Sequence, residues 1–205
     1  MGQYVVGTAV VLAGGQSVRM GQDKSMIPLG DKRMIERVLD KVGEVCSELI
    51  VVTGKGYDLE WLKALYNIQQ VEDVEVGAGP LCGLYSGLLA STNEFNFVVG
   101  CDMPFLNTSL VKWLLSEAGS NDVVAGVVNG EKQTLHAVYS KNCIQAIRTL
   151  LSSERTSLKS LLEQVKTRLV PETELKIRDP ELRSFYNINT SIDLFNAQKF
   201  LGGLI

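Results

Sequence analysis

Residues that could bind phosphate follow an apolar run near the start of the chain. The run covers residues 5–12 (VVGTAVVL), and the residues of interest after it are Gly14, Gly15, Arg19, Gly21 and Lys24. Glycines leave backbone N–H groups open to an approaching oxyanion, because no Cβ atom stands between them. Arginine and lysine add full positive charge, which suits a triphosphate better than a single phosphate. The segment therefore predicts a phosphate-binding loop.

Two common phosphate-binding motifs do not fit this loop. The P-loop needs Lys-Ser or Lys-Thr after its last glycine, but here Gly21 is followed by Gln22. The dinucleotide fingerprint needs G-x-G-x-x-G at the start of a helix, whereas Gly14 and Gly15 are adjacent and Pro28 delays any helix. The absence of that fingerprint argues against a dehydrogenase.

A carboxylate stands at the end of a second apolar run. Asp102 follows residues 95–101 (FNFVVGC) and precedes a turn that contains Pro104. An aspartate at a strand end beside a phosphate loop is well placed to bind Mg²⁺, whose remaining ligands are phosphate oxygens and water. From position alone, Asp102 could instead cap the helix that follows.

The elements that position these residues can be read from hydrophobic periodicity. Apolar, β-branched runs predict strands, and 3.6-residue periodicity predicts helices between them. The predicted strands are 5–12, 49–52, 68–71, 95–101, 122–128 and 134–139; the predicted helices are 34–42, 58–65, 80–90, 108–117, 141–151, 158–165 and 192–201. The dipeptide Asn129-Gly130 predicts an antiparallel hairpin. This order predicts a three-layer α/β/α, Rossmann-like fold with a mostly parallel sheet, formed as a single domain over residues 1–205, with ligands at the carboxyl ends of the strands.

Composition limits the possible partners and compartments. The chain has 205 residues, 45% hydrophobic residues and a net charge of −3, so we expect neither nucleic acid nor an anionic membrane as a partner. No secretory leader or long apolar segment is recognisable, which favours a soluble, cytoplasmic protein. The four cysteines form no C-x-x-C pair, which argues against a zinc site, and we expect most of them to be buried.

Four segments, taken in order, carry a resemblance to a known family. They are LAGGQSVRMGQDK (12–24), GPLCGL (79–84), CDMP (101–104) and NINT (187–190). With them the chain resembles the molybdenum cofactor guanylyltransferase (MobA) family over most of its length. The resemblance implies transfer of GMP from GTP to molybdopterin or its molybdenum form, with release of pyrophosphate and Mg²⁺ as cofactor. It also implies other cofactor-biosynthesis proteins or recipient molybdoenzymes as partners.

The resemblance also implies roles for individual residues. The implied catalytic residues are Arg19, Lys24 and Asp102, with Asp102 as the metal ligand. The implied GTP-binding residues are Leu12, Ala13, Gly14, Gly15, Lys24, Thr53, Asp73 and Asp102. Some family members have asparagine where this chain has Thr53. Asp73 is the preferred match to an acidic residue that contacts the nucleotide, with Glu72 as the alternative, and a carboxylate there could accept the N1–H and amino donors of guanine.

Several other residues have open roles. Asn187 and Asn189 could reach the metal and phosphates or the second substrate, or could only fix the turn before the last helix. His136, Trp61 and Trp113 are expected to be structural. The charged candidates for binding the pterin are Lys132, Arg148, Arg155 and Lys159.

Two other functions remain open. A cytidylyltransferase of the same fold could act on molybdopterin or on a sugar or polyol phosphate. Its relatives more often read Ala-Ala-Gly, whereas this chain has Ala13-Gly14-Gly15, which favours GTP. A non-catalytic nucleotide sensor could use the same loop, although such a protein would not need Lys24 and Asp102 together.

Overall fold

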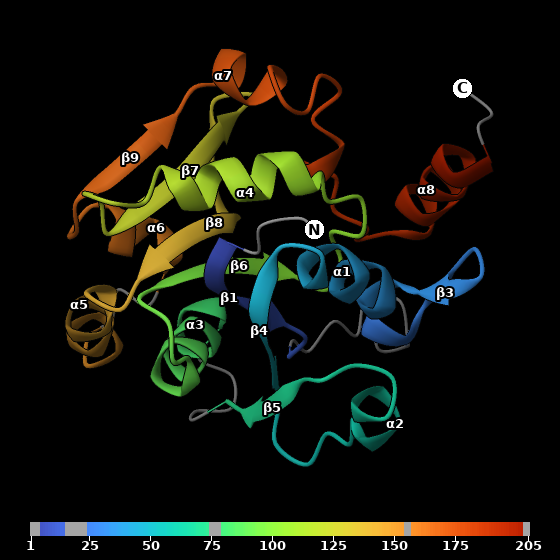
Figure 1. Cartoon of the computed structure of the whole chain (residues 1–205), viewed down its shortest axis with the longest axis horizontal. Coiled ribbons are helices and arrows are strands. Elements are labelled where there is room, and N and C mark those ends of the chain that lie inside the picture. Colours follow the sequence, from blue (N-terminus) through green and yellow to red (C-terminus); the bar gives the residue numbers. More distant parts are fainter. Residues whose placement is uncertain (1–4, 15–23, 74–78, 154–156, 203–205) are drawn as a thin grey trace.

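A seven-stranded sheet forms the centre of the computed structural model, which describes residues 5–14, 24–73, 79–153 and 157–202 (Figure 1). The strand order is β5-β4-β1-β6-β8-β7-β9. The strands are β1 (Val5–Leu12), β4 (Cys46–Thr53), β5 (Gln69–Glu72), β6 (Phe95–Gly100), β7 (Val123–Val128), β8 (Glu131–Ser140) and β9 (Thr167–Val170). Only β8 runs against its neighbours β6 and β7; the other pairings are parallel.

Helices cover both faces of the sheet. One face packs against α1 (Met34–Gly43), α4 (Thr108–Ser116) and α7 (Glu172–Lys176), and the other against α3 (Pro80–Ala90), α5 (Cys143–Leu151) and α6 (Leu158–Leu162). Successive side chains of a strand point to opposite faces, so Val10 of β1 joins one core and Val11 the other. A short helix, α2 (Glu60–Lys63), lies beside β5. The molecule therefore has three layers.

A smaller apolar cluster lies beside the main sheet. The hairpin of β2 (Pro28–Leu29) and β3 (Lys32–Arg33) contacts the last helix, α8 (Ser191–Gly202). The cluster is formed by Ile27, Leu29, Met34, Ile188 and Ala197. Two short 3₁₀ helices, η2 (Lys24–Met26) and η3 (Arg183–Phe185), precede these segments. Within the part of the chain that the structure describes, no helix has the length and apolar character needed to cross a membrane.

The predicted fold class is confirmed. Strands and helices alternate as expected, and β7 and β8 form the antiparallel hairpin, with φ of 51° at Asn129 and 78° at Gly130. These positive φ values are those of the turn that Asn-Gly favours. The β2–β3 hairpin, β9, α7 and the two 3₁₀ helices were not predicted. The predicted helices 58–65 and 158–165 are shorter, since α2 and α6 end at Lys63 and Leu162.

Candidate functional site

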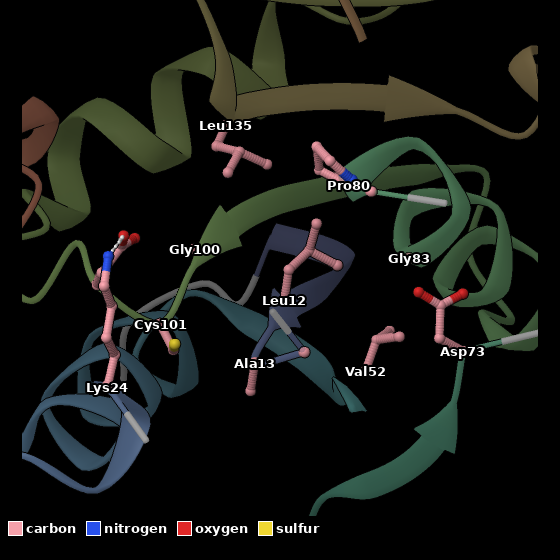
Figure 2. Close-up of a pocket in the computed structure, with 13 residues that line it drawn as sticks. Leu12, Ala13, Lys24, Val52, Asp73, Pro80, Gly83, Gly100, Cys101 and Leu135 are labelled. Carbon is pink, nitrogen blue, oxygen red and sulfur yellow. Dashed lines mark ion pairs between the residues drawn. The ribbon is translucent and has the colours of Figure 1, made fainter. Parts of the chain in front are cut away.

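A cavity of about 210 Å³ opens at the carboxyl ends of the central strands (Figure 2). In an open α/β sheet this edge is where ligands bind. β1 lies between β4 and β6, and helices α1 and α3 cover opposite faces beside it. The cavity is lined by Leu12, Ala13, Gly14, Lys24, Val52, Asp73, Gly79, Pro80, Gly83, Gly100, Cys101, Asp102 and Leu135.

Lys24 and Asp102 form one end of the cavity. The Lys24 Nζ atom lies 3.6 Å from Asp102 Oδ2, and the two side chains are 11% and 21% exposed. Burial raises the pKa of the Asp102 carboxyl above its usual value, and the nearby Lys24 ammonium partly opposes this effect. The carboxylate would therefore gain from additional positive charge in the cavity.

The strand end and a neighbouring glycine fix the position of Asp102. Cys101 N–H donates to the carbonyl of Leu12 at 3.1 Å, which keeps the ends of β6 and β1 paired. A Cβ atom on Gly100 would lie 2.5 Å from Asp102 Oδ1. Only glycine at position 100 therefore leaves the carboxylate room to occupy its observed position.

The start of the glycine-rich loop forms the floor of the cavity. Ala13 N–H donates to the Val52 carbonyl at 2.8 Å, so the chain stays paired with β4 just past the end of β1. At Gly14 an added Cβ atom would lie 2.9 Å from the backbone nitrogen of Gly54. This close backbone approach requires glycine at position 14. Gly15 and Arg19 lie outside the described residues.

Asp73 lies on the side of the cavity opposite Lys24, with Leu12 and Ala13 between them (Figure 2). Its N–H donates to the Thr53 carbonyl at 2.8 Å, and its carboxylate accepts a hydrogen bond from the Ser86 hydroxyl of α3 at 3.2 Å. Glu72 is exposed and accepts the N–H of Gly56 instead. Of the two acidic residues considered from the sequence, Asp73 is the one in the cavity wall.

Leu135 was not predicted as a site residue. It lies near Gly100 in the cavity wall, on β8 (Figure 2). Because β8 is antiparallel to β6, the N-terminal part of β8 lies at the edge where the parallel strands have their carboxyl ends. An apolar residue in a strand carries no chemical signal, so only the sheet order could have identified it.

Thr53 and Asn187 do not line the cavity. Thr53 is fully buried, and its hydroxyl accepts a hydrogen bond from Gln70 Nε2 at 3.1 Å. The side-chain amide of Asn187 donates to the Phe185 carbonyl at 3.3 Å. Asn189, by contrast, accepts a hydrogen bond from Lys24 Nζ at 2.6 Å. The segment NINT thus reaches the site through its second asparagine.

His136 and the two tryptophans lie away from the cavity. The His136 ring is fully buried between Phe97 and Phe185, at centroid distances of 5.0 and 4.5 Å. Trp61 and Trp113 are partly buried against the core, and their rings are covered by arginine side chains.

The remaining residues considered from the sequence are the cysteines and the other basic candidates. Cys46, Cys82, Cys101 and Cys143 are all buried, in agreement with the expectation that most of them would be. Arg148 contacts the Tyr85 hydroxyl, and Lys159 forms an ion pair with Glu131. Lys132 does not line the cavity, and Arg155 lies outside the described residues.

The cavity fits a metal ion that arrives with a ligand better than a resident one. Among the described residues no group of three His, Cys, Asp or Glu side chains could hold an ion. At the Lys24 end, the cavity lining described includes one carboxylate, Asp102. Mg²⁺ is commonly held by one or two carboxylates together with substrate phosphates and water. The donor set therefore suits Mg²⁺ bound together with a ligand that carries phosphate groups.

Comparison with solved structures supports the same fold. A molybdopterin-guanine dinucleotide biosynthesis protein A from Archaeoglobus fulgidus has a TM-score of 0.83 and 25% identity, covering 96% of this chain and 99% of the other. A 4-diphosphocytidyl-2C-methyl-D-erythritol synthase from Anaerococcus prevotii has a TM-score of 0.73 and 20% identity, covering 96% of each chain. At that identity the second similarity shows the fold alone.

Sequence comparison identifies the family. A protein of Natranaerobius thermophilus, named "Probable molybdenum cofactor guanylyltransferase", is 34% identical over 197 residues, which cover 95% of this chain and 96% of the relative. The "Molybdenum cofactor guanylyltransferase" of Desulfosudis oleivorans is 33% identical over 93% of this chain and 94% of its own. Residues 9–169 match the family described as the MobA-like NTP transferase domain, and the chain belongs to this family of nucleotidyltransferases.

Proposed function

We propose that this protein transfers GMP from GTP to the terminal phosphate of molybdopterin or its molybdenum form, releasing pyrophosphate. The observation that carries the proposal is the arrangement of Lys24, Asp102 and Asp73 around one cavity at the carboxyl ends of the strands. The names of the full-length relatives supply the chemistry of the two substrates. The product is the guanine dinucleotide form of the cofactor.

The proposed orientation of GTP follows from the charges in the cavity. The triphosphate lies at the Lys24 end, where an ammonium group attracts anions. The glycine-rich loop, which the sequence predicts to bind phosphate, begins at Gly14 in the lining of the same cavity. Guanine lies toward Asp73, whose carboxylate accepts hydrogen bonds from the N1–H and amino groups of the base. Adenine and cytosine lack that pair of donors, so Asp73 favours guanine.

The reaction forms one P–O bond and breaks another. An oxygen of the molybdopterin phosphate attacks the α-phosphorus of GTP, and the bond from that phosphorus to the bridging oxygen breaks, so pyrophosphate leaves with the electron pair. A phosphate monoester is already anionic near neutral pH, so no strong general base is required. Lys24 then stabilises the charge that develops on the transferred and leaving phosphates.

Asp102 would hold Mg²⁺ together with phosphate oxygens and water. When bound, the ion supplies positive charge at the phosphates. The raised pKa of the buried Asp102 carboxyl supports this assignment, because a carboxylate with little solvent is stabilised by an added cation. The other partners that we propose are cofactor-biosynthesis proteins or recipient molybdoenzymes, in the cytoplasm.

The test is pyrophosphate release with molybdopterin, Mg²⁺ and each nucleoside triphosphate in turn. We expect release with GTP, and release with CTP but not GTP would instead support the cytidylyltransferase alternative. Binding of GTP with no release on adding molybdopterin would support a sensor.

Variants of the site residues test the assigned roles. Lys24→Ala and Asp102→Ala should each reduce turnover by about 10²- to 10³-fold, because each removes a charge that acts on the transition state. Lys63→Ala, which only breaks an exposed ion pair with Glu60 on α2, should keep wild-type turnover. Near wild-type turnover in Lys24→Ala or Asp102→Ala would contradict the assigned roles.

A further inference from the structure

The second asparagine of the segment NINT contacts the lysine that we place at the triphosphate. Lys24 Nζ donates to Asn189 Oδ1 at 2.6 Å, whereas its distance to Asp102 Oδ2 is 3.6 Å. The two residues are separated by 165 positions in the chain. The amide oxygen is therefore the nearer of these two partners of the ammonium group.

The backbone before Asn189 is anchored to the site. Ile188 N–H donates to the Asp102 carbonyl at 2.9 Å. The Ile188 side chain is fully buried in the cluster that also contains Ile27, three residues after Lys24. The contacts of Ile188 therefore hold the segment against both sides of the Lys24–Asp102 pair.

The backbone after Asn189 is held by the start of α8. The Asp193 carboxylate accepts hydrogen bonds from the N–H groups of Asn189 and Thr190, at 3.0 and 2.8 Å, and Asp193 N–H donates to the Thr190 hydroxyl at 3.1 Å. This reciprocal pattern is a capping box, which fixes the chain where it enters a helix. The amide of Asn189 is therefore presented by backbone that is fixed on both sides.

The chemistry of an amide suits a role in positioning a cation. Lysine has three donors on a flexible four-carbon stem, and ordering that stem costs conformational entropy. A neutral oxygen can engage one donor without cancelling the charge, so the remaining donors and the full positive charge stay available for Asp102 and for phosphate. A carboxylate in the same place would neutralise the ammonium and weaken its attraction for an anion.

We propose that Asn189 is a positioning residue that orders the Lys24 ammonium for the nucleotide triphosphate. The inference rests on the proposed function in one respect, namely that Lys24 binds the triphosphate. Asn189 itself acts through Lys24, and Asp193 and Ile188 hold Asn189 in place.

A double-mutant cycle in ligand affinity tests this role. The four proteins are the wild type, Asn189→Ala, Lys24→Ala and the double variant, and the probes are Mg²⁺ with GTP and Mg²⁺ with inorganic triphosphate, measured by calorimetry. In the wild-type background we expect Asn189→Ala to weaken binding of both probes by about 10-fold, the size of one charge-assisted contact. In the Lys24→Ala background its effect should be under about twofold, because the group it positions is gone.

Two further variants separate positioning from general damage. Asn189→Asp keeps an acceptor oxygen but adds a negative charge, so it should bind both probes more weakly than Asn189→Ala. The control is Asn142, which directly precedes α5 and has an exposed side-chain amide that donates to the Asp122 carboxylate. Asn142→Ala removes this amide and should bind both probes as the wild type does.

Equal losses from Asn189→Ala in both backgrounds, or no measurable binding of either probe to the wild type, would overturn the inference. Inorganic triphosphate has no base and cannot donate GMP. The cycle with that probe therefore measures the Lys24–Asn189 coupling whichever nucleotide the enzyme uses. If pyrophosphate release shows that the enzyme uses CTP, the proposed function is refuted, but the inference about Asn189 is not.

Discussion

Replacing His136 by asparagine is expected to make the protein less sensitive to acid. The His136 imidazole is fully buried against Phe97 and Phe185, and neither ring nitrogen has a hydrogen-bond partner among the residues that the structure describes. Burial therefore lowers the pKa of His136 from 6.5 to about 4, and the polar backbone of His136 itself and the nearby Asp179 carboxylate oppose this only in part. The backbone φ at position 136 is 66°, a left-handed conformation that asparagine tolerates better than most residues.

The sign of the effect follows from proton binding. Between pH 6.5 and pH 4 the unfolded chain protonates His136 while the folded protein does not, so protons favour unfolding in this range. His136 makes its full contribution to the free energy of unfolding above pH 6.5, and this contribution is lost as the pH falls through about 4. Below that pH, His136 causes no further change in the free energy of unfolding. The two pKa values differ by about 2.5, which corresponds to about 3 kcal/mol, and about 2 kcal/mol of it is lost between pH 7 and pH 5.

Urea unfolding of the wild type and of His136→Asn at pH 7 and pH 5 measures this contribution. Other groups titrate in both proteins, so the difference between the two pH dependences isolates His136. We expect the wild type to lose about 2 kcal/mol more than the variant over this interval. If the two proteins lose the same free energy of unfolding, His136 titrates alike in the folded and unfolded states and the reasoning is refuted.

Three further predictions concern single positions. Gly100→Ala should lower kcat/KM for pyrophosphate release by about 10-fold or more, because its Cβ atom would displace the Asp102 carboxylate. The Tm should be nearly unchanged, since the carboxylate can move, and wild-type activity would contradict this prediction. Gly87→Ala should lower the free energy of unfolding, measured in urea, by about 1–3 kcal/mol, because the new Cβ atom would overlap Val10 in the core. Unchanged stability would show that the neighbouring side chains move to make room for it. Asn107→Ala should lower the free energy of unfolding by about 1–2 kcal/mol in the same assay, because Asn107 caps α4 and donates to the Arg178 carbonyl. A decrease below about 0.5 kcal/mol would show that water replaces the cap.

The sequence predicts the central strands well because they are buried on both faces. Runs such as VVGTAVVL and FNFVVG carry apolar residues at nearly every position, a pattern that few other structures require. The strand β9 was missed for the opposite reason: its four residues include Thr167 and Arg168, it lies at the sheet edge, and only Val170 is fully buried. Short edge strands are determined by a partner, here β7, rather than by their own composition.

Leu12 and Ala13 also line the cavity and were expected from the family resemblance, but residue chemistry alone predicts the site only where a residue type implies what it binds. Lys24, Asp73 and Asp102 are charged residues at strand ends or next to glycines, and the structure places all three around one cavity. Leu135 carries no such signal and reaches the cavity because β8 is reversed. The contact of Asn189 with Lys24 depends on how the last helix folds back onto the β2–β3 hairpin, and no local pattern encodes that packing.

The contact between Lys24 and Asn189 also has a consequence during translation. Ribosomes release the N-terminal residues first, so the strands β4, β1 and β6 and the glycine-rich loop are complete long before residue 189 emerges. Until then the lysine has no amide to hold it. If Asn189 orders Lys24 as proposed, a chain that ends before residue 189 should bind the nucleotide more weakly than the full-length protein, and each new molecule should reach its full nucleotide affinity only late in its synthesis.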